Sequence, residues 1–264
     1  MNLSLLLFII LIFLITLLSG FVSGIFGGGS GLINVPGFYL LLHYFYPLND
    51  HLMQVAIASA VSSGVLVGIL ATFKQHKYKQ ICYDTLRWSL FSILLGGILG
   101  VFLVNVIKSN DLKIVFSILL IIMATWMWRK TKKALKVWQA PLILKTLSAF
   151  FAGMCTMLSG ISVFFIPLLI KCGLDIRKAI GTSTIITFFI SLVMSIFFIS
   201  FGWHASNLPP FCIGYLNLII FLAGLIPSLI GVNIGVKVTA LFSHKHLQTI
   251  YILMMFIIAI VMIV

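Results

Sequence analysis

Long uninterrupted stretches of apolar residues dominate the chain. Most are close to the roughly 20 residues that an α-helix needs to cross a bilayer, and the two shortest begin directly after small residues. A transmembrane β-barrel would instead alternate apolar and polar residues in segments of about 10. The pattern therefore predicts an all-α polytopic membrane protein, with apolar segments at residues 3–24, 32–46, 52–73, 86–107, 112–128, 141–157, 163–170, 176–201, 209–236 and 247–264.

Composition excludes a water-soluble protein. Hydrophobic residues make up 62% of the 264 residues, and 17 Lys and Arg stand against 4 acidic residues, all of them Asp. Soluble domains are about 25% charged, so this chain has too few charges to cover a wetted surface. A net charge of +13 indicates basic loops retained in the cytoplasm, and no nucleic-acid partner is expected. The four cysteines lack CxxC spacing, so neither a metal nor another cofactor is predicted.

The chain divides into two halves that resemble each other. A basic linker at residues 129–140 separates a first membrane repeat at 1–128 from a second at 141–264. Four short similarities recur in the same order in both halves and predict a duplication. They pair 27–36 with 158–167, 55–60 with 179–184, 96–100 with 231–235, and 111–113 with 246–248. The third pair contains two GxxxG spacings, which favour close helix packing.

The distribution of positive charge favours halves of opposite orientation. If each half made four simple crossings, one side of the membrane would hold ten Lys and Arg and the other seven. If the broken segments 3–46 and 141–170 each enter and leave on one side, three crossings follow per half, and 15 of the 17 fall on one side. Because basic loops stay in the cytoplasm, we expect an inverted repeat. Each half would contain a Gly- or Ser-broken helix pair and three spanning helices, with both termini outside.

A run of small residues breaks the first of these segments at Gly27, Gly28, Gly29, Ser30 and Gly31. Each glycine costs a helix interior about 1 kcal/mol relative to alanine, so four glycines in five positions end the helix. Broken backbone is tolerated at membrane depth only where it is buried in protein or lines a cavity. The next helix would direct its free N–H groups and positive dipole end into the break. The run therefore predicts an anion site without a formal charge; close packing through small residues is the alternative.

A weaker break follows in the second half at Ser159, Gly160 and Ser162. Inverted repeats bring such breaks together near the bilayer midplane, so these residues join the predicted substrate site. Pro36 and Pro167 follow the two breaks at similar distances. They are interpreted as structural hinges, or alternatively as ordinary kinks.

Four further polar residues are candidates for the substrate site. Asn34 lies one helical turn past the glycine run and can donate an amide N–H to an anion; an interhelical hydrogen bond is the alternative. Ser59, Thr182 and Ser183 lie on helices rich in small residues. Their alternative is hydrogen bonding to their own backbone.

Some function classes are disfavoured by what the apolar segments lack. No segment centre contains Asp or Glu, and no Walker motif is present, so neither a carboxylate proton relay nor ATP hydrolysis is predicted. No nucleophile–base pair or metal-ligand cluster is suitably spaced, so no catalytic residue is assigned and an intramembrane enzyme is the weakest alternative. A non-transporting subunit or scaffold is the other. The preferred interpretation is a permease for a small anion in the lipid bilayer, with a homo-oligomer left open.

The Gly-rich break with its following proline, the repeated small-residue helices and the basic linker together resemble the sulfite exporter TauE/SafE family. The resemblance covers nearly the whole chain. It implies a multi-pass transporter of small anions, typically sulfur-containing ones such as sulfite or sulfonates, in the bacterial inner membrane. The family usually has a glycine run before the second proline, where this chain has residues 161–165, a departure that argues against equal use of the two breaks. The family motif falls on Gly27, Gly28, Gly29, Gly31 and Pro36, and on Ser159, Gly160 and Pro167.

Overall fold

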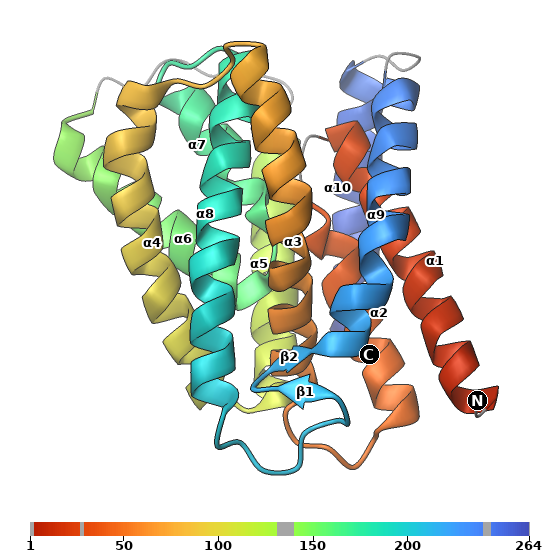
Figure 1. The fold of residues 1–264 in the computed structure, drawn as a ribbon. Helices are drawn as coiled ribbons and strands as arrows, with labels where there is room; N and C mark the ends of the chain where they lie inside the picture. Colours follow the sequence, from red (N-terminus) through yellow and green to blue (C-terminus); the bar gives the residue numbers. More distant parts are fainter. Residues whose placement is uncertain (1–2, 27–28, 131–139, 240–243, 264) are drawn as a thin grey trace.

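A computed structural model describes residues 3–26, 29–130, 140–239 and 244–263 of the chain. Over these ranges the protein consists of α-helices with one 3₁₀ turn and one small hairpin (Figure 1). In chain order the elements are α1 (Leu3–Phe26), α2 (Gly31–Phe45), α3 (Leu52–Lys77), α4 (Tyr83–Val106), α5 (Ser109–Lys130), α6 (Leu142–Ser159), η1 (Ser162–Phe164), α7 (Phe165–Lys171), α8 (Ile176–Gly202), β1 (Cys212–Ile213), β2 (Leu216–Asn217), α9 (Leu218–Thr239) and α10 (His244–Ile263).

Most of the helices are built to lie in lipid. In the part of the chain that the structure describes, seven are long and apolar enough to cross a bilayer: α1, α3, α4, α5, α6, α8 and α9. By contrast, α2 has 15 residues and α7 has 7, and at about 1.5 Å per residue both reach only part of the way. The shorter apolar stretch of α10 is Thr249–Met262. The prediction of an all-α polytopic membrane protein is confirmed.

The path of the chain begins and ends toward the same face (Figure 1). α1 rises from the lower face and α2 returns to it, after which α3, α4 and α5 cross in turn. α6 then descends from the upper face and α7 returns to it, after which α8 runs down, α9 runs up and α10 runs down again. The two short helices, α2 and α7, are thus the return arms of two pairs that start from opposite faces.

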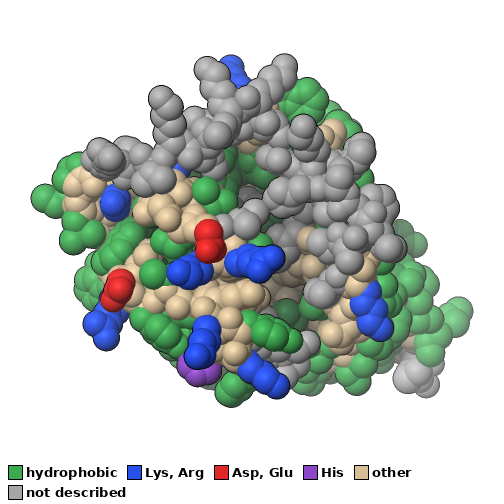
Figure 2. All heavy atoms as spheres, turned by 90° about the horizontal axis from the view of Figure 1, so that it is seen from above, with side chains coloured by type: hydrophobic (Ala, Val, Ile, Leu, Met, Phe, Trp, Pro, Cys, Tyr) green, Lys and Arg blue, Asp and Glu red, His purple; other side chains and the backbone are tan. Residues whose placement is uncertain are grey.

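Basic side chains gather on the upper face, which Figure 2 shows from above. Helix ends and loops at this face carry Lys77, Arg87, Lys171 and Lys178, whereas the lower face has Lys108 and Lys113 around the start of α5. We call these surfaces the basic face and the opposite face. Most of the predicted linker, residues 131–139, lies outside the described residues.

The helices of each half pack mainly against helices of the other half. α1 lies against α9 and α4 against α6, while α3 packs against α8 and α5 against α10. Glycines allow the backbones to touch at the first two interfaces. A β-carbon at Gly96 would overlap the carbonyl of Phe150, and one at Gly231 would overlap that of Leu17. The GxxxG spacings therefore serve close helix packing.

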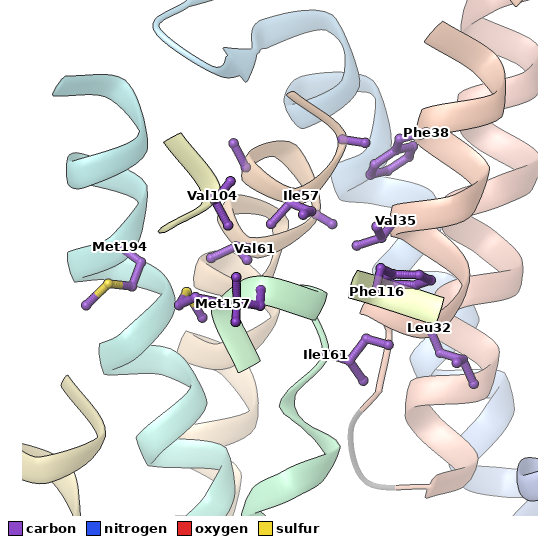
Figure 3. Close-up of a cluster of buried hydrophobic side chains, with 14 of the residues drawn as sticks. Leu32, Val35, Phe38, Ile57, Val61, Val104, Phe116, Met157, Ile161 and Met194 are labelled. Carbon is purple, nitrogen blue, oxygen red and sulfur yellow. The ribbon is translucent and has the colours of Figure 1, made fainter. Parts of the chain in front are cut away.

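Apolar side chains surround the starts of the two return arms (Figure 3). Leu32 and Val35 from α2 lie with Ile57 from α3 and Phe116 from α5, beside Ile161 of the second break. All five are fully buried. The broken backbone therefore lies inside protein and not against lipid, as unsatisfied N–H and C=O groups require.

The segment between α8 and α9 differs from the sequence prediction. We expected one apolar segment over 209–236, but α9 begins at Leu218, and β1 and β2 form an antiparallel hairpin before it. Pro209 and Pro210 lack the N–H that a continuing helix would need. Asn217 then caps α9, because its side-chain oxygen accepts a hydrogen bond from the N–H of Ile220 at 3.1 Å. The hairpin packs against α3 near the opposite face, where α3 begins.

Candidate functional site

The two helix breaks meet inside the protein. α6 ends at Ser159, and Gly160 follows in the left-handed conformation, with φ of +66°, which often terminates helices. α2 begins at Gly31, whose backbone lies so close to Gly160 that a β-carbon at residue 31 would overlap the Gly160 carbonyl oxygen. Glycine at position 31 is therefore required by direct contact between the two breaks.

Gly29 holds the first break in a conformation that side chains rarely allow. Its φ is +92°, and a β-carbon there would overlap the hydroxyl of Tyr251 from α10. Tyr251 is 2% exposed, so its ring forms a fixed wall behind the break. Sequence analysis missed this residue, and the available signal was a hydroxyl-bearing side chain within the apolar stretch of α10.

A small cavity lies where the breaks face α3 and α8. Val61 and Met157, which form part of its apolar wall, lie near each other in Figure 3. No charged side chain contributes to the lining, and both halves of the chain do. The lining residues are Ser30 and Gly31 from the first break, Ala60, Val61 and Gly64 from α3, Thr156 and Met157 from α6, Gly160 and Ser162 from the second break, and Thr187, Ile190 and Ser191 from α8.

Several hydroxyl groups of this lining are free to bind a ligand. The side chains of Ser30, Ser162, Thr187 and Ser191 make no hydrogen bond to another described residue. The Thr156 hydroxyl is different, because it donates to the carbonyl of Ala152 at 2.7 Å. A serine or threonine hydroxyl can donate one hydrogen bond, so the cavity offers neutral donors from three different elements.

Backbone donors at the start of α2 add to these hydroxyls. The N–H groups of Ser30 and Gly31 have no partner among the described residues, whereas those of Leu32 and Asn34 donate to Gly29 and Ser30 carbonyls, each at 2.9 Å. The first N–H groups of a helix carry its positive dipole end. The first break therefore presents two amides and one hydroxyl at a favourable position for negative charge.

The structure brings part of the predicted site together. Ser30, Gly31, Gly160 and Ser162 line the cavity, and Gly29 lies directly behind it. Gly27 and Gly28 lie outside the described residues.

Two other predicted residues lie beside the breaks with part of their bonding capacity used. Ser159 donates to the carbonyl of Cys155 at 2.7 Å and accepts from the N–H of Ile161 at 3.3 Å. Asn34 is 2% exposed, and its Nδ2 donates to Ser63 Oγ on α3 at 3.5 Å. Its Oδ1 has no partner among the described residues. The amide thus joins α2 to α3 with one of its two N–H donors and leaves its acceptor oxygen unpaired.

The remaining candidates do not line the cavity. Ser59 Oγ accepts from the N–H of Asn217 at 3.1 Å, and Thr182 Oγ1 accepts from the N–H of Cys82 at 3.0 Å. Ser183 donates to the carbonyl of Ile180 at 2.9 Å, within its own helix. Pro36 and Pro167 lie inside α2 and α7, which continue through them.

Thr187 and Ser191 are lining residues that sequence analysis missed. The signal was a row of hydroxyl residues spaced by four along α8, at Ser183, Thr187, Ser191 and Ser195. Residues four apart lie on one face of a helix, so this row marked the face of α8 turned toward the breaks. Elsewhere in the described chain, no three His, Cys, Asp or Glu side chains come together as a metal site would require.

Comparisons with known proteins agree with this architecture. A probable membrane transporter protein of Haemophilus influenzae is 28% identical over 257 residues, which cover 96% of this chain and 97% of the relative. A probable membrane transporter protein of Methanocaldococcus jannaschii is 24% identical over 245 residues, or 90% of this chain and 89% of the relative. One from Bacillus subtilis is 26% identical over 125 residues, or 47% and 45%. No solved structure matches the chain.

The family comparison covers the same extent. The sequence model of the sulfite exporter TauE/SafE family matches residues 12–262, from within α1 to the end of α10. Both breaks and all the cavity-lining residues fall inside this match. The chain therefore belongs to the sulfite exporter TauE/SafE family of membrane transporters.

Proposed function

We propose that this transporter carries a small sulfur-containing anion, such as sulfite or a sulfonate, through the cavity between its two breaks and across a bacterial inner membrane. The observation that supports this proposal is the uncharged cavity with free hydroxyl and amide donors at the start of α2. The two backbone amides can only donate, and the hydroxyls can turn to donate as well, so this lining at a helix N-terminus suits an anion. The sulfur-containing class is supported by the family description, sulfite exporter.

Neutral donors suit a substrate that must be both bound and released. A hydrogen bond to a charged group contributes about 1.5–3 kcal/mol, and the dipole end of α2 favours negative charge further. Several such bonds offset the loss of water around the anion. A Lys or Arg at the same place would bind the anion more strongly and slow its release, and none lines the cavity.

We also propose that residues 1–128 and 141–264 are inverted repeats joined by a cytoplasmic linker at 129–140. The helix packing supports this, because contacts occur in corresponding pairs. α1 on α9 matches α6 on α4, and α2 on α3 matches α7 on α8. The central contacts, α3 with α8 and α5 with α10, join equivalent helices. The basic face is then cytoplasmic and both termini are outside. Reporter fusions that place Val264 in the cytoplasm would contradict this arrangement.

Flux measurements in proteoliposomes test the substrate. The wild-type chain is assayed with sulfite, sulfate, a short sulfonate and acetate, and we expect saturable flux for a sulfur-containing anion. Ser191→Ala should weaken that flux. Ser148→Ala, which removes an exposed hydroxyl bonded within α6, should not. Equally low flux of all four anions would overturn the anion proposal, and saturable flux of acetate alone would overturn the sulfur-containing class.

A further inference from the structure

A hydrogen bond between the two halves fixes the chain over the opposite face. The N–H of Asn217, the residue just before α9, donates to Ser59 Oγ on α3 at 3.1 Å. Both residues are almost completely buried, at 1% and 0% exposure. This bond holds the hairpin that follows α8 onto α3.

A corresponding hydrogen bond fixes the chain over the basic face. The N–H of Cys82, the residue just before α4, donates to Thr182 Oγ1 on α8 at 3.0 Å. Thr182 is 0% exposed. The loop before α4 packs closely against α8 here, because a β-carbon at Gly181 would overlap the carbonyl of Gln80. Two loops, one from each half, are thus each held by one backbone N–H bonded to one buried hydroxyl. We call these bonds the two latches.

The latches lie on opposite sides of the cavity. α3 starts at the opposite face, so Ser59 lies just before Ala60 and Val61 of the lining. α8 starts at the basic face, so Thr182 lies just before Thr187 and Ser191. Along each of these two helices, the latch therefore lies between one face and the lining residues.

We propose that Ser59 and Thr182 are positioning residues that keep the two ends of the transport path closed, and that transport breaks their hydrogen bonds in turn. Ser59 controls the opposite face and Thr182 the basic face. The inference rests on the chain being a transporter but not on which anion it carries. Its test uses no anion, so its outcome is independent of the substrate proposal.

The two ends are not closed equally. At the opposite face, Asn49 Nδ2 donates to the carbonyl of Asn207 at 2.8 Å, and Asn207 Nδ2 donates to the carbonyl of Leu48 at 2.9 Å. These bonds tie the loop after α2 to the segment after α8. Among the described residues, the latch is the single hydrogen bond between the loop before α4 and a side chain of α8. We therefore expect the basic face to open more readily.

Thiol accessibility from each side tests the proposal. Cys82, Cys155, Cys172 and Cys212 are replaced by alanine, and Val61→Cys places one reporter thiol in the cavity wall. A membrane-impermeant thiosulfonate reagent is applied from either side of oriented proteoliposomes. Thr182→Val should raise the modification rate from the basic face about 2- to 10-fold, the effect of losing one neutral hydrogen bond. The rate from the opposite face should stay unchanged.

The Ser59 latch should act on the other side. Ser59→Ala should raise modification from the opposite face alone, and by less, because the Asn49–Asn207 bonds remain. Adding Asn207→Gly, which tolerates the left-handed φ of +59° at this position, should increase the effect further.

Matched controls separate a latch from a general loss of packing. Thr184→Val removes a hydroxyl that bonds only within α8, and Ser117→Ala removes a fully buried one that bonds within α5. Neither should change the modification rate from either face. Thr182→Ser keeps the hydroxyl and should therefore keep the wild-type rate. If Thr182→Val fails to insert, using Cys82→Pro in place of Cys82→Ala removes the same bond from its donor side. Unchanged rates, or equal increases from both faces, would overturn the proposal.

Discussion

The two breaks occupy corresponding places in the two halves and are built from different chemistry. The first depends on backbone freedom: Gly29 has φ of +92°, and Gly31 touches the other break directly. The second uses one left-handed glycine, Gly160, followed by a 3₁₀ turn and a helix of only 7 residues. Its Ser159 hydroxyl accepts the N–H of Ile161.

This difference makes the two breaks unequal as hydrogen-bond donors. A side chain in the second break uses a backbone donor that the first break leaves open, because glycine has no side chain to bond it. The amides of Ser30 and Gly31 have no partner in the described chain. We therefore expect the first break to bind the substrate charge, and the second to support it through Ser162 and the contact at Gly31.

The largest effect should come from filling the backbone space of the first break. Gly29→Val should abolish transport, because valine strongly disfavours φ near +92° and its side chain would overlap Tyr251. Gly160→Asn should lower transport less, since asparagine tolerates the left-handed region, although its β-carbon would press on the buried side chain of Val35. Flux at matched membrane levels checks both variants, and normal flux in Gly29→Val would show that the glycine run is only a packing device.

A smaller effect should follow from removing single hydroxyls around the cavity. Ser30→Ala, Thr187→Val and Ser191→Ala should each raise the apparent KM for the anion about 10- to 100-fold, as expected for a bond to a charged group. Ser159→Ala should have less effect, because that hydroxyl already bonds the protein on both sides. Concentration series of anion flux measure these shifts. A larger loss in Ser159→Ala than in Ser30→Ala would reverse the proposed ranking of the two breaks.

The helices that follow the two return arms, α3 and α8, also start differently. This difference should have a smaller effect on transport. Asp175 caps α8 by accepting the N–H of Lys178 at 2.7 Å, whereas Asp50, before α3, accepts from Asn207 Nδ2 at 3.2 Å. Asp175→Asn should leave both stability and flux near wild type, because asparagine is an equally good cap. Asp175→Ala should lower the free energy of unfolding by about 1 kcal/mol. Thermal unfolding in detergent and flux assays check these results; loss of flux in Asp175→Asn would indicate a role in transport for the carboxylate.

The smallest effect concerns the loop before α9. Burial raises the pKa of the Cys212 thiol to about 11, although a hydrogen bond from Asn217 opposes the shift. The thiolate is the reactive form, so alkylation should be slow at pH 7. Between pH 7 and 9, well below the pKa, the rate should rise about tenfold per pH unit. Mass spectrometry of the modified peptide measures this rate, with Cys212→Ser as the control. A plateau below pH 9 would contradict the raised pKa.

The fold was largely predictable because its signals are local. Apolar run lengths located nearly all the helices, and the glycine run located the first break. The hairpin was not predicted, because the apolar residues after Pro210 continue the hydropathy of α9 and only the two prolines marked its start.

The site was less predictable because it depends on which helix faces meet. The polarity of Ser59 and Thr182 predicts a place in the site, yet the cavity lining begins further along the same helices, at Ala60 and Thr187. A few residues of displacement along a helix decide whether a hydroxyl lines a cavity or fixes a loop. Tyr251 could not be found by local pattern either, because its role arises from a contact with Gly29, more than 200 positions earlier in the chain.

The backbone contact between α1 and α9 has a consequence for how the protein is made. Gly20 of α1 fits against the carbonyl of Ser228, so α1 finds its main partner only after the chain through α9 has been synthesised. Until then, its small-residue face must be covered by lipid or by the insertion machinery. Contacts between distant segments slow assembly, and the first half cannot reach its final packing alone. The first half therefore completes its packing late in membrane insertion, when α9 and then α10 reach α1 and α5.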